Sequence, residues 1–191
     1  MKALLALSIA LLLVFPAPAA DLSEGMVLVA KRQLRDRYYG ATIIVARSIG
    51  SDQHIGFIVN RPSRRTLGEL FPQHAPSRKV SDPVYIGGPI SPESIFALVR
   101  KRSSPGGRSV ELMPGLYAVF DAKLVDEVIE HDAGHARFMA GIVGWRTGEL
   151  RDEIRRGAWH VLDADPKLVL RDPDGLWEEL VRRAEQRANL I

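Results

Sequence analysis

The amino-acid sequence predicts a single α+β domain with a mixed β-sheet and flanking helices. The chain has 191 residues, a length that suits one domain. Its 46% hydrophobic and 26% charged residues are typical of a globular protein. Apolar runs of strand length are intermixed with a few helical segments, which are too few and too late in the chain for regular β-α-β winding.

The chain after residue 20 begins with apolar runs that predict three strands. These are segments 25–30, 41–46 and 55–59. The polar segment 48–53 contains Gly50 and Asp52 and predicts a turn, so the second and third strands are expected to form a hairpin.

The middle of the chain is expected to alternate short strands with turns and one short helix. Segment 60–63 breaks the third strand at a proline, and Ser91-Pro92 predicts a turn or a single helical turn. Thr66 and Glu69 match a capping box, so a short helix is expected to start there. Further short strands are expected at 84–86, 94–99, 110–112 and 116–119.

The last third of the chain predicts three helices. Asp121 is a suitable N-cap for a helix through His131, because the apolar residues that follow share one helical face. Segment 144–148 predicts a turn into a second helix. The expected strands are 136–143, 159–162 and 167–170, and the expected later helices are 149–156 and an amphipathic one from residue 176.

Residues 1–20 have the layout of a secretory signal peptide. Lys2 gives a positive start, residues 3–15 carry no charge, and small residues and prolines follow. Ala17-Pro18-Ala19 fits the small-residue cleavage rule, so cleavage is expected after Ala19 or Ala20, leaving 21–191 as the domain. The apolar run is short for a membrane span, so we expect a periplasmic or secreted protein without an integral membrane segment after cleavage.

Composition excludes several classes of chemistry. The chain has no cysteine, which removes disulfides, thiol catalysis and cysteine-ligated metal sites. The formal net charge is +3, and basic residues are scattered among acidic ones. A nucleic-acid-binding domain has a more one-sided basic face, so the arginine clusters are interpreted as solvated surface residues.

The first candidate site is the strand end at Asn60, Arg61 and Pro62. The Arg61 guanidinium is suited to hold a carboxylate or a phosphate through two parallel hydrogen bonds. In the alternative interpretation, Asn60 caps the turn and Arg61 pairs with a structural carboxylate such as Glu153.

Two further segments offer backbone amides. Gly87 and Gly88 allow close approach to a ligand or simply a tight turn, without the spacing of a phosphate-binding loop. Trp145 and Arg146 precede an expected helix N-terminus that suits an anion. However, Glu149 already complements that dipole, and a tryptophan at this position favours packing in or at the rim of the core. The expected recognition cleft, for an unknown protein or a small anionic ligand, comprises Asn60, Arg61, Gly87, Gly88, Trp145 and Arg146.

No metal, cofactor or catalytic residue is expected. His131 and His135 are four residues apart, but Gly134 and the expected helix end argue against a shared metal, and a third ligand is lacking nearby. No Gly-x-Ser-x-Gly motif or triad order matches a nucleophilic enzyme.

Several ordered segments resemble the YqgE/AlgH family. The most specific are Asn-Arg-Pro at 60–62, Gly-Gly-Pro at 87–89 and Gly-Trp-x-x-Gly-x-Leu at 144–150, the last followed by Glu153 and Ala158-Trp159. The resemblance implies a compact fold whose sheet curls into a pseudo-barrel, with no assigned biochemical activity. The family carries the label of a transcriptional regulator of alginate synthesis, a role that an exported member cannot perform on chromosomal DNA.

Three functions follow as hypotheses. The leading one is an exported, non-enzymatic binding or accessory protein. A cytoplasmic transcriptional regulator is the alternative if residues 1–20 are not a working signal. A hydrolase is the third, using Arg61 and Glu149 near a glycine-rich turn, with Glu149 as general base, which requires a raised pKa of the Glu149 carboxyl inside a pocket.

Overall fold

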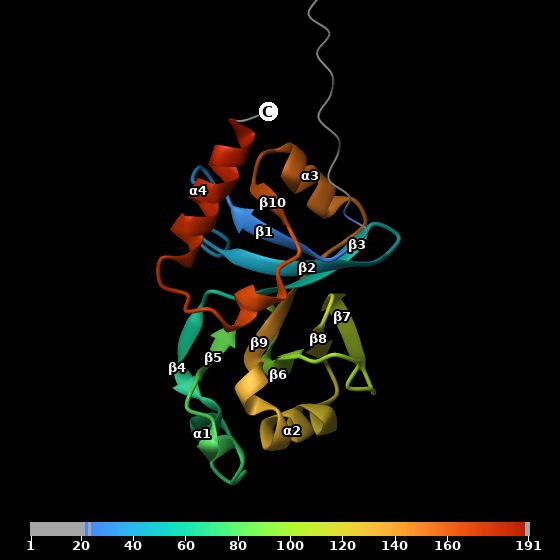
Figure 1. Ribbon diagram of the computed structural model, residues 1–191, viewed down its shortest axis with the longest axis vertical. Coiled ribbons are helices and arrows are strands. Elements are labelled where there is room, and N and C mark those ends of the chain that lie inside the picture. Colours follow the sequence, from blue (N-terminus) through green and yellow to red (C-terminus); the bar gives the residue numbers. More distant parts are fainter. Residues whose placement is uncertain (1–21, 23, 190–191) are drawn as a thin grey trace, which may run out of the picture.

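The computed structural model describes residues 22 and 24–189, so the expected signal peptide lies outside the described residues (Figure 1). The strands are β1 (Met26–Ala30), β2 (Ile43–Gly50), β3 (Gln53–Ile58), β4 (Pro62–Thr66), β5 (Pro83–Ile86), β6 (Ile90–Arg100), β7 (Ser109–Met113), β8 (Leu116–Val119), β9 (Ala136–Trp145) and β10 (Trp159–Asp163). The helices are α1 (Leu67–Leu70), α2 (Ala122–His131), α3 (Glu149–Arg155) and α4 (Leu176–Ala188), with the 3₁₀ turns η1 (Ser77–Lys79), η2 (Ala133–His135) and η3 (Pro166–Leu170).

The strands form one mixed sheet, as predicted. The order is β10-β1-β2-β3-β9-β6-β8-β7, and β4 joins through β5. The β5–β9 pair is parallel, and the other pairs of this sheet are antiparallel. The long strand β9 pairs with β3, β5 and β6 and so connects the two halves of the molecule (Figure 1).

The sheet curls into a half-barrel, which confirms the predicted fold class. Arg47 in β2 donates from Nη1 to the backbone carbonyl of Glu111 in β7, although these strands lie far apart in the sheet order. The helices flank the curled sheet: α3 and α4 lie by β1 and β10, and α1 and α2 lie at the opposite end (Figure 1).

Alternate residues of the first strands pack into two different cores. Val27 and Val29 face one core with Leu180 of α4, whereas Leu28 faces another with Trp159. Successive strand residues point to opposite faces, so burial on both sides requires an uninterrupted apolar sequence. This is why the run at 25–30 lacks the alternation of a half-exposed strand.

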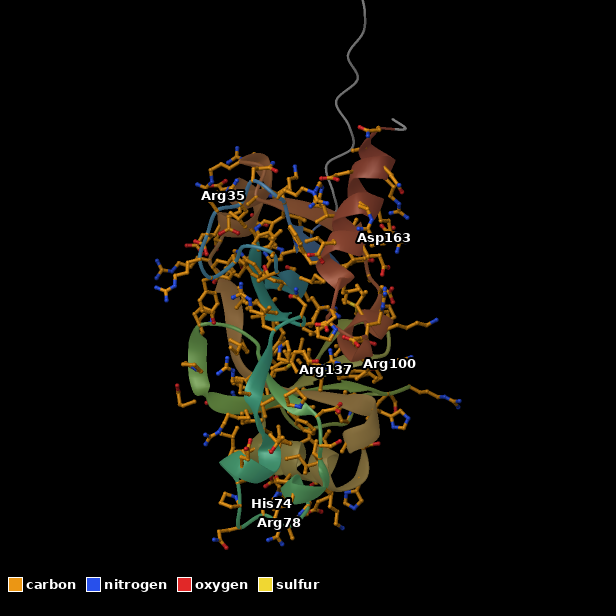
Figure 2. All side chains as sticks on the ribbon, turned by 90° about the vertical axis from the view of Figure 1, so that its left-hand side faces the viewer. Arg35, His74, Arg78, Arg100, Arg137 and Asp163 are labelled. Carbon is orange, nitrogen blue, oxygen red and sulfur yellow. The ribbon has the colours of Figure 1, made fainter. Side chains whose placement is uncertain are left out.

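A buried arginine fixes the middle of the molecule (Figure 2). Arg137 in β9 is 8% exposed, and its guanidinium lies 4.0 Å from the ring centroid of Tyr85. Its Nη1 donates to the carbonyl oxygens of Arg171 at 3.2 Å and Val59 at 3.4 Å. Arg137 therefore connects β9 to the segments after β3 and η3.

The predicted helix starts are confirmed by their caps. The Thr66 side chain accepts the amide of Glu69, and the Glu69 carboxylate accepts the amide of Thr66. The Asp121 side chain accepts the amide of Leu124 at the start of α2.

Segment 167–170 was predicted to be a strand, and that prediction is wrong. It forms η3, which begins at Pro166 and is capped by the Asp165 side chain through the amide of Lys167. Proline has no backbone N–H to donate to a neighbouring strand, and it suits the first position of a helix. Asp165 and Pro166 therefore start a helical turn, although the residues that follow are apolar enough for a strand.

The predicted turn at 144–148 starts too early. Strand β9 continues through Trp145, because Trp145 and Gly144 pair with His54 and Ile55 of β3. The turn begins at Arg146.

The predicted turn at Ser91-Pro92 is also wrong, because these residues lie inside β6. The register to β9 shifts between Ile90 and Ile95, and Ser91 has a positive φ of 50°, so the strand is irregular there. The short strand β4 was not predicted, because its sequence has no apolar alternation.

Candidate functional site

Glu153 in α3 lies between two buried tryptophans. Its Oε2 accepts the indole N–H of Trp145 at 3.0 Å and that of Trp159 at 2.8 Å. Trp145 ends β9 and Trp159 begins β10, and their side chains are 6% and 4% exposed. Hydrogen bonds to a charged acceptor are stronger than neutral ones, so this carboxylate is held in a fixed orientation.

The Glu153 side chain lines a cavity of about 380 Å³, here named the Glu153 cavity. A volume of this order suits a small ligand. One wall is the loop between β1 and β2, marked by Arg35 in Figure 2, and the other is the segment from α3 into β10. The lining residues are Gln33, Leu34, Asp36, Tyr39, Glu153, Arg156, Gly157, Ala158 and Trp159.

The loop wall is shaped by Asp36. Its Oδ1 accepts the backbone amides of Tyr38 and Tyr39, both at 2.7 Å, as in an Asx turn. The Tyr39 ring packs edge-on against Trp159, with centroids 6.2 Å apart. The amide of Lys31 donates to the carbonyl of Ala158 at 2.9 Å and joins the two walls at the base of the loop.

The carboxylates shape the electrostatics of the cavity. Burial raises the pKa of the Tyr39 hydroxyl, and Tyr38, Glu153 and Asp36 raise it further. Tyr39 therefore stays protonated at neutral pH and keeps its hydroxyl as a hydrogen-bond donor.

Asn60 and Arg61 lie behind the loop wall and do not line the Glu153 cavity. Asn60 accepts the amide of Ile43 at 2.8 Å and donates to the carbonyl of Ala41 at 3.0 Å. Arg61 donates to the carbonyl of Gly40 at 3.0 Å, and its guanidinium lies 5.7 Å from the ring centroid of Tyr38.

The predicted alternative pairing of Arg61 with Glu153 is wrong, because the Arg61 guanidinium donates to the carbonyl of Gly40 and Glu153 accepts the two indoles. Arg61 supports the loop between β1 and β2 through the Gly40 carbonyl oxygen and the face of the Tyr38 ring. Asn60 and Arg61 thus hold the loop that forms one wall of the cavity.

Gly87 and Gly88 form a close backbone crossing with β9. The Gly87 amide donates to Ala140 at 2.8 Å, and its carbonyl accepts the amide of Ile58 at 2.8 Å. A Cβ at Gly87 would lie 2.3 Å from the carbonyl oxygen of Gly141, and one at Gly88 would lie 2.0 Å from the carbonyl carbon of Ile142. Glycine is required at both positions by packing, and neither residue lines the Glu153 cavity.

Arg146 and Glu149 form the local turn before α3. The Arg146 amide donates to Glu149 Oε2 at 2.8 Å, and the Arg146 side chain is exposed. The Glu149 carboxylate thus accepts the hydrogen bond of an amide that was expected to be free to bind an anion. Of the six sequence candidates, only Trp145 contacts Glu153, and none lines the cavity directly.

A second cavity of about 390 Å³ lies between α1, η1 and α2, at the end marked by His74 in Figure 2. Here His74 Nδ1 lies 2.8 Å from Ser77 Oγ, and Nε2 lies 3.9 Å from Glu130. Ser77 is fully buried, and its amide donates to the His74 carbonyl, so the pair stabilises the η1 turn.

Sequence reasoning missed Asp36 and Tyr39 as site residues and treated Glu153 as a structural partner of Arg61. No sequence motif links these three residues, because Asp36 and Tyr39 lie more than a hundred residues before Glu153 in the chain. Within residues 22 and 24–189, no group of three or more His, Asp or Glu side chains is arranged to hold a metal ion. No helix in that part of the chain is long and apolar enough to cross a membrane.

Comparison with known proteins matches most of the chain to one family. Residues 27–189 match the family described as AlgH-like. A UPF0301 protein of Mycolicibacterium smegmatis is 32% identical over 182 residues, covering 93% of this chain and 90% of that protein. A UPF0301 protein of Streptomyces coelicolor is 30% identical over 174 residues, covering 87% of this chain and 88% of that protein.

Two solved structures share the fold. Protein DIP2367 from Corynebacterium diphtheriae has a TM-score of 0.68 and 24% identity, with 84% of this chain and 86% of that chain covered. The AlgH protein from Pseudomonas aeruginosa has a TM-score of 0.66 and 22% identity, with 83% and 86% covered. At these identities the likeness concerns the fold alone.

Proposed function

The chain belongs to the AlgH-like family, and we propose that it is an exported, non-enzymatic binding protein whose ligand site is the Glu153 cavity. The observation that carries the binding proposal is the fixed carboxylate of Glu153 at the edge of a cavity of ligand size. Binding sites of this kind combine apolar walls with a few oriented polar groups.

The lining of the cavity favours binding over catalysis. Among the described residues that line it, none is a serine, histidine or lysine. The two indoles fix the orientation of the Glu153 carboxylate. The cavity therefore offers an acceptor, a phenol and apolar contact to a ligand.

A fragment screen by thermal unfolding tests this proposal. Fragments that bind the folded protein raise its melting temperature by mass action. We expect hits on the wild type that Glu153→Gln loses, because the substitution removes the charge and alters the acceptor. Trp177→Phe is the control, since Trp177 bonds to the carbonyl of Ala30 and lies outside the cavity lining. If every hit persists in Glu153→Gln, the site is contradicted; hits on this site are expected to persist in Trp177→Phe.

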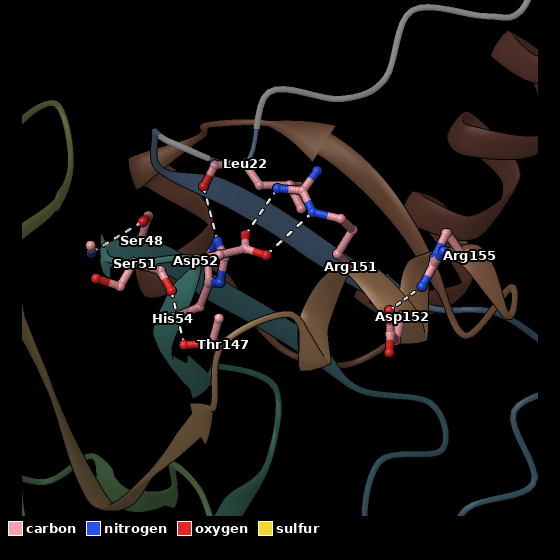
Figure 3. Close-up of polar contacts among 10 residues, drawn as sticks. Leu22, Ser48, Ser51, Asp52, His54, Thr147, Arg151, Asp152 and Arg155 are labelled. Atoms are coloured by element: carbon pink, nitrogen blue, oxygen red, sulfur yellow. Dashed lines mark hydrogen bonds and ion pairs between the residues drawn. The ribbon is translucent and has the colours of Figure 1, made fainter.

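Export is supported by the N-terminal layout and by where the folded domain begins. Leu22 is 6% exposed, and its carbonyl oxygen lies 3.0 Å from Nε2 of the buried His54 (Figure 3). Leu22 would be the second or third residue of the expected product, so cleavage after Ala19 or Ala20 would keep this packed residue in the mature chain.

Cell fractionation with mass spectrometry of the mature N-terminus tests export. We expect a periplasmic product that starts at Ala20 or Asp21. Leu11→Arg places a charge in the apolar stretch and is expected to keep the chain in the cytoplasm. An intact cytoplasmic wild-type product would overturn export and favour the cytoplasmic regulator instead.

A further inference from the structure

We propose that the Glu153 cavity takes a small organic ammonium ion, with Glu153 as the acceptor of its N–H groups. This inference rests on the proposed binding function and names the class of its ligand. It departs from the anionic ligand expected from the sequence, because the residues that suggested an anion do not line the cavity.

The hydrogen-bond inventory of Glu153 favours a donor ligand. An ionised carboxylate has about four acceptor positions on two oxygens. Both indole donors bond to Oε2, and Oε1 receives no hydrogen bond within the described part of the chain. A ligand that forms hydrogen bonds to the remaining acceptor positions of Glu153 must have N–H or O–H donors. A cationic donor gains most, because Glu153 is half-buried and screening by water is reduced.

Two of the three charged residues that line the cavity are acidic. Asp36 and Glu153 are the acidic residues of the lining, and Arg156 is its one basic residue. Arg156 is exposed, and no ion pair involving it is found among residues 22 and 24–189. The half-buried Glu153 carboxylate is therefore the charged group of the lining that water screens least, since Asp36 and Arg156 are both exposed.

The remaining walls suit an apolar body on the ammonium ion. Leu34 and Tyr39 come from the loop, and Ala158 comes from the segment before β10. Each is half-buried and presents apolar surface to the cavity. An aromatic wall also attracts cations through its ring face. The expected ligand thus combines a charged N–H donor with a small hydrophobic group.

Three phenyl compounds of similar size and different charge test the charge preference: benzylammonium, benzyl alcohol and benzoate. The indole N–H resonances of the three tryptophans provide the readout. Trp145 and Trp159 contact Glu153, whereas Trp177 donates to Ala30 and serves as the internal reference. We expect benzylammonium to shift the signals of Trp145 and Trp159 at the lowest concentration, followed by the alcohol and then benzoate.

Two substitutions separate the charge effect from a folding defect. Glu153→Gln is expected to weaken benzylammonium binding about tenfold or more, because a hydrogen bond to a charged acceptor is lost. Arg156→Gln removes an exposed like charge and is expected to strengthen benzylammonium binding about two- to fivefold. Arg156 makes no structural ion pair in the described chain, so this variant is expected to fold normally.

The outcomes distinguish the ligand class from the binding function. Benzoate binding as tightly as benzylammonium, or weaker benzylammonium binding in Arg156→Gln, overturns the ammonium proposal while leaving a ligand-binding cavity. If no probe moves the two indole signals, the ammonium proposal fails. If the fragment screen also yields no hit that depends on Glu153, the binding function fails as well.

Discussion

At the scale of the residue, one carboxylate satisfies two buried donors. Trp145 and Trp159 are almost fully buried, and both indole N–H groups bond to the same oxygen of Glu153. A buried donor without an acceptor costs free energy, so Glu153 has a structural role as well as the proposed binding role.

Replacement of Glu153 by leucine is therefore expected to destabilise the fold. Two indole donors lose their acceptor, and we expect a loss of about 2–4 kcal/mol in the free energy of unfolding. Glu153→Gln retains a carbonyl acceptor and is expected to cost less. Urea denaturation measures both, with the exposed Glu127→Leu as control, expected within about 0.5 kcal/mol of wild type. Equal stability of Glu153→Leu and wild type would contradict the two buried hydrogen bonds.

A second prediction at this scale concerns His160 in β10. Burial, together with the charge of Lys31, lowers its pKa below the ordinary value of 6.5. Between the lowered pKa and 6.5 the unfolded chain binds more protons than the folded one, so stability falls as the pH falls through this window. We expect His160→Gln to lose less stability than wild type between about pH 7.5 and about pH 5.5. The exposed His135→Gln is the control, and a pH response of His160→Gln identical to that of wild type would contradict the prediction.

At the scale of the element, α3 is docked by the β2–β3 turn (Figure 3). Asp52 accepts two hydrogen bonds from Arg151, at 2.9 and 3.3 Å, and its carbonyl accepts the amide of Gly148. The Thr147 hydroxyl donates to the carbonyl of Ser51 at 3.0 Å. Since α3 carries Glu153, this turn helps to position the proposed binding site.

The docking of α3 is expected to weaken in acid. The hydrogen bond from Arg151 holds the pKa of the Asp52 carboxyl below its usual value of 3.8. A lowered carboxyl pKa contributes stability above the unfolded value and loses it as the pH falls through the folded value. Asp52→Asn is thus expected to be less stable than wild type at neutral pH, with the difference shrinking below about pH 4. Urea midpoints across this range measure it, with the exposed Asp126→Asn as control. A constant difference at all pH values would contradict the ion pair.

The sequence predicted the elements whose own residues favour them, and it did not predict those that form only because they pair with a distant strand. The capped helices α1 and α2 and the hairpin of β2 and β3 follow from side-chain caps, periodicity and turn residues. Strand β4 is polar and owes its form to pairing with β5, and β9 is extended to Trp145 by pairing with β3. Neither pairing can be recognised from the residues of the strand itself.

At the scale of the whole molecule, sheet order creates the Glu153 cavity. Strand β1 pairs with β10, so the loop after β1 lies beside the segment that leads from α3 into β10. Strand β9 reaches the same end through β3 and delivers Trp145. The family resemblance indicated the fold, but the cavity depends on which strands become neighbours. For that reason the sequence suggested Arg61 as a ligand residue, whereas the structure places it behind the loop wall.

The central claim is that the Glu153 cavity is a ligand site, and the indole N–H spectrum of the mature chain tests it most directly. Fragments that raise the melting temperature are added one at a time to wild type and to Glu153→Gln. We expect the signals of Trp145 and Trp159 to move in wild type and not in the variant, while the signal of Trp177 stays in place. Stabilising fragments that leave both signals unmoved, or that move only Trp177, would contradict it.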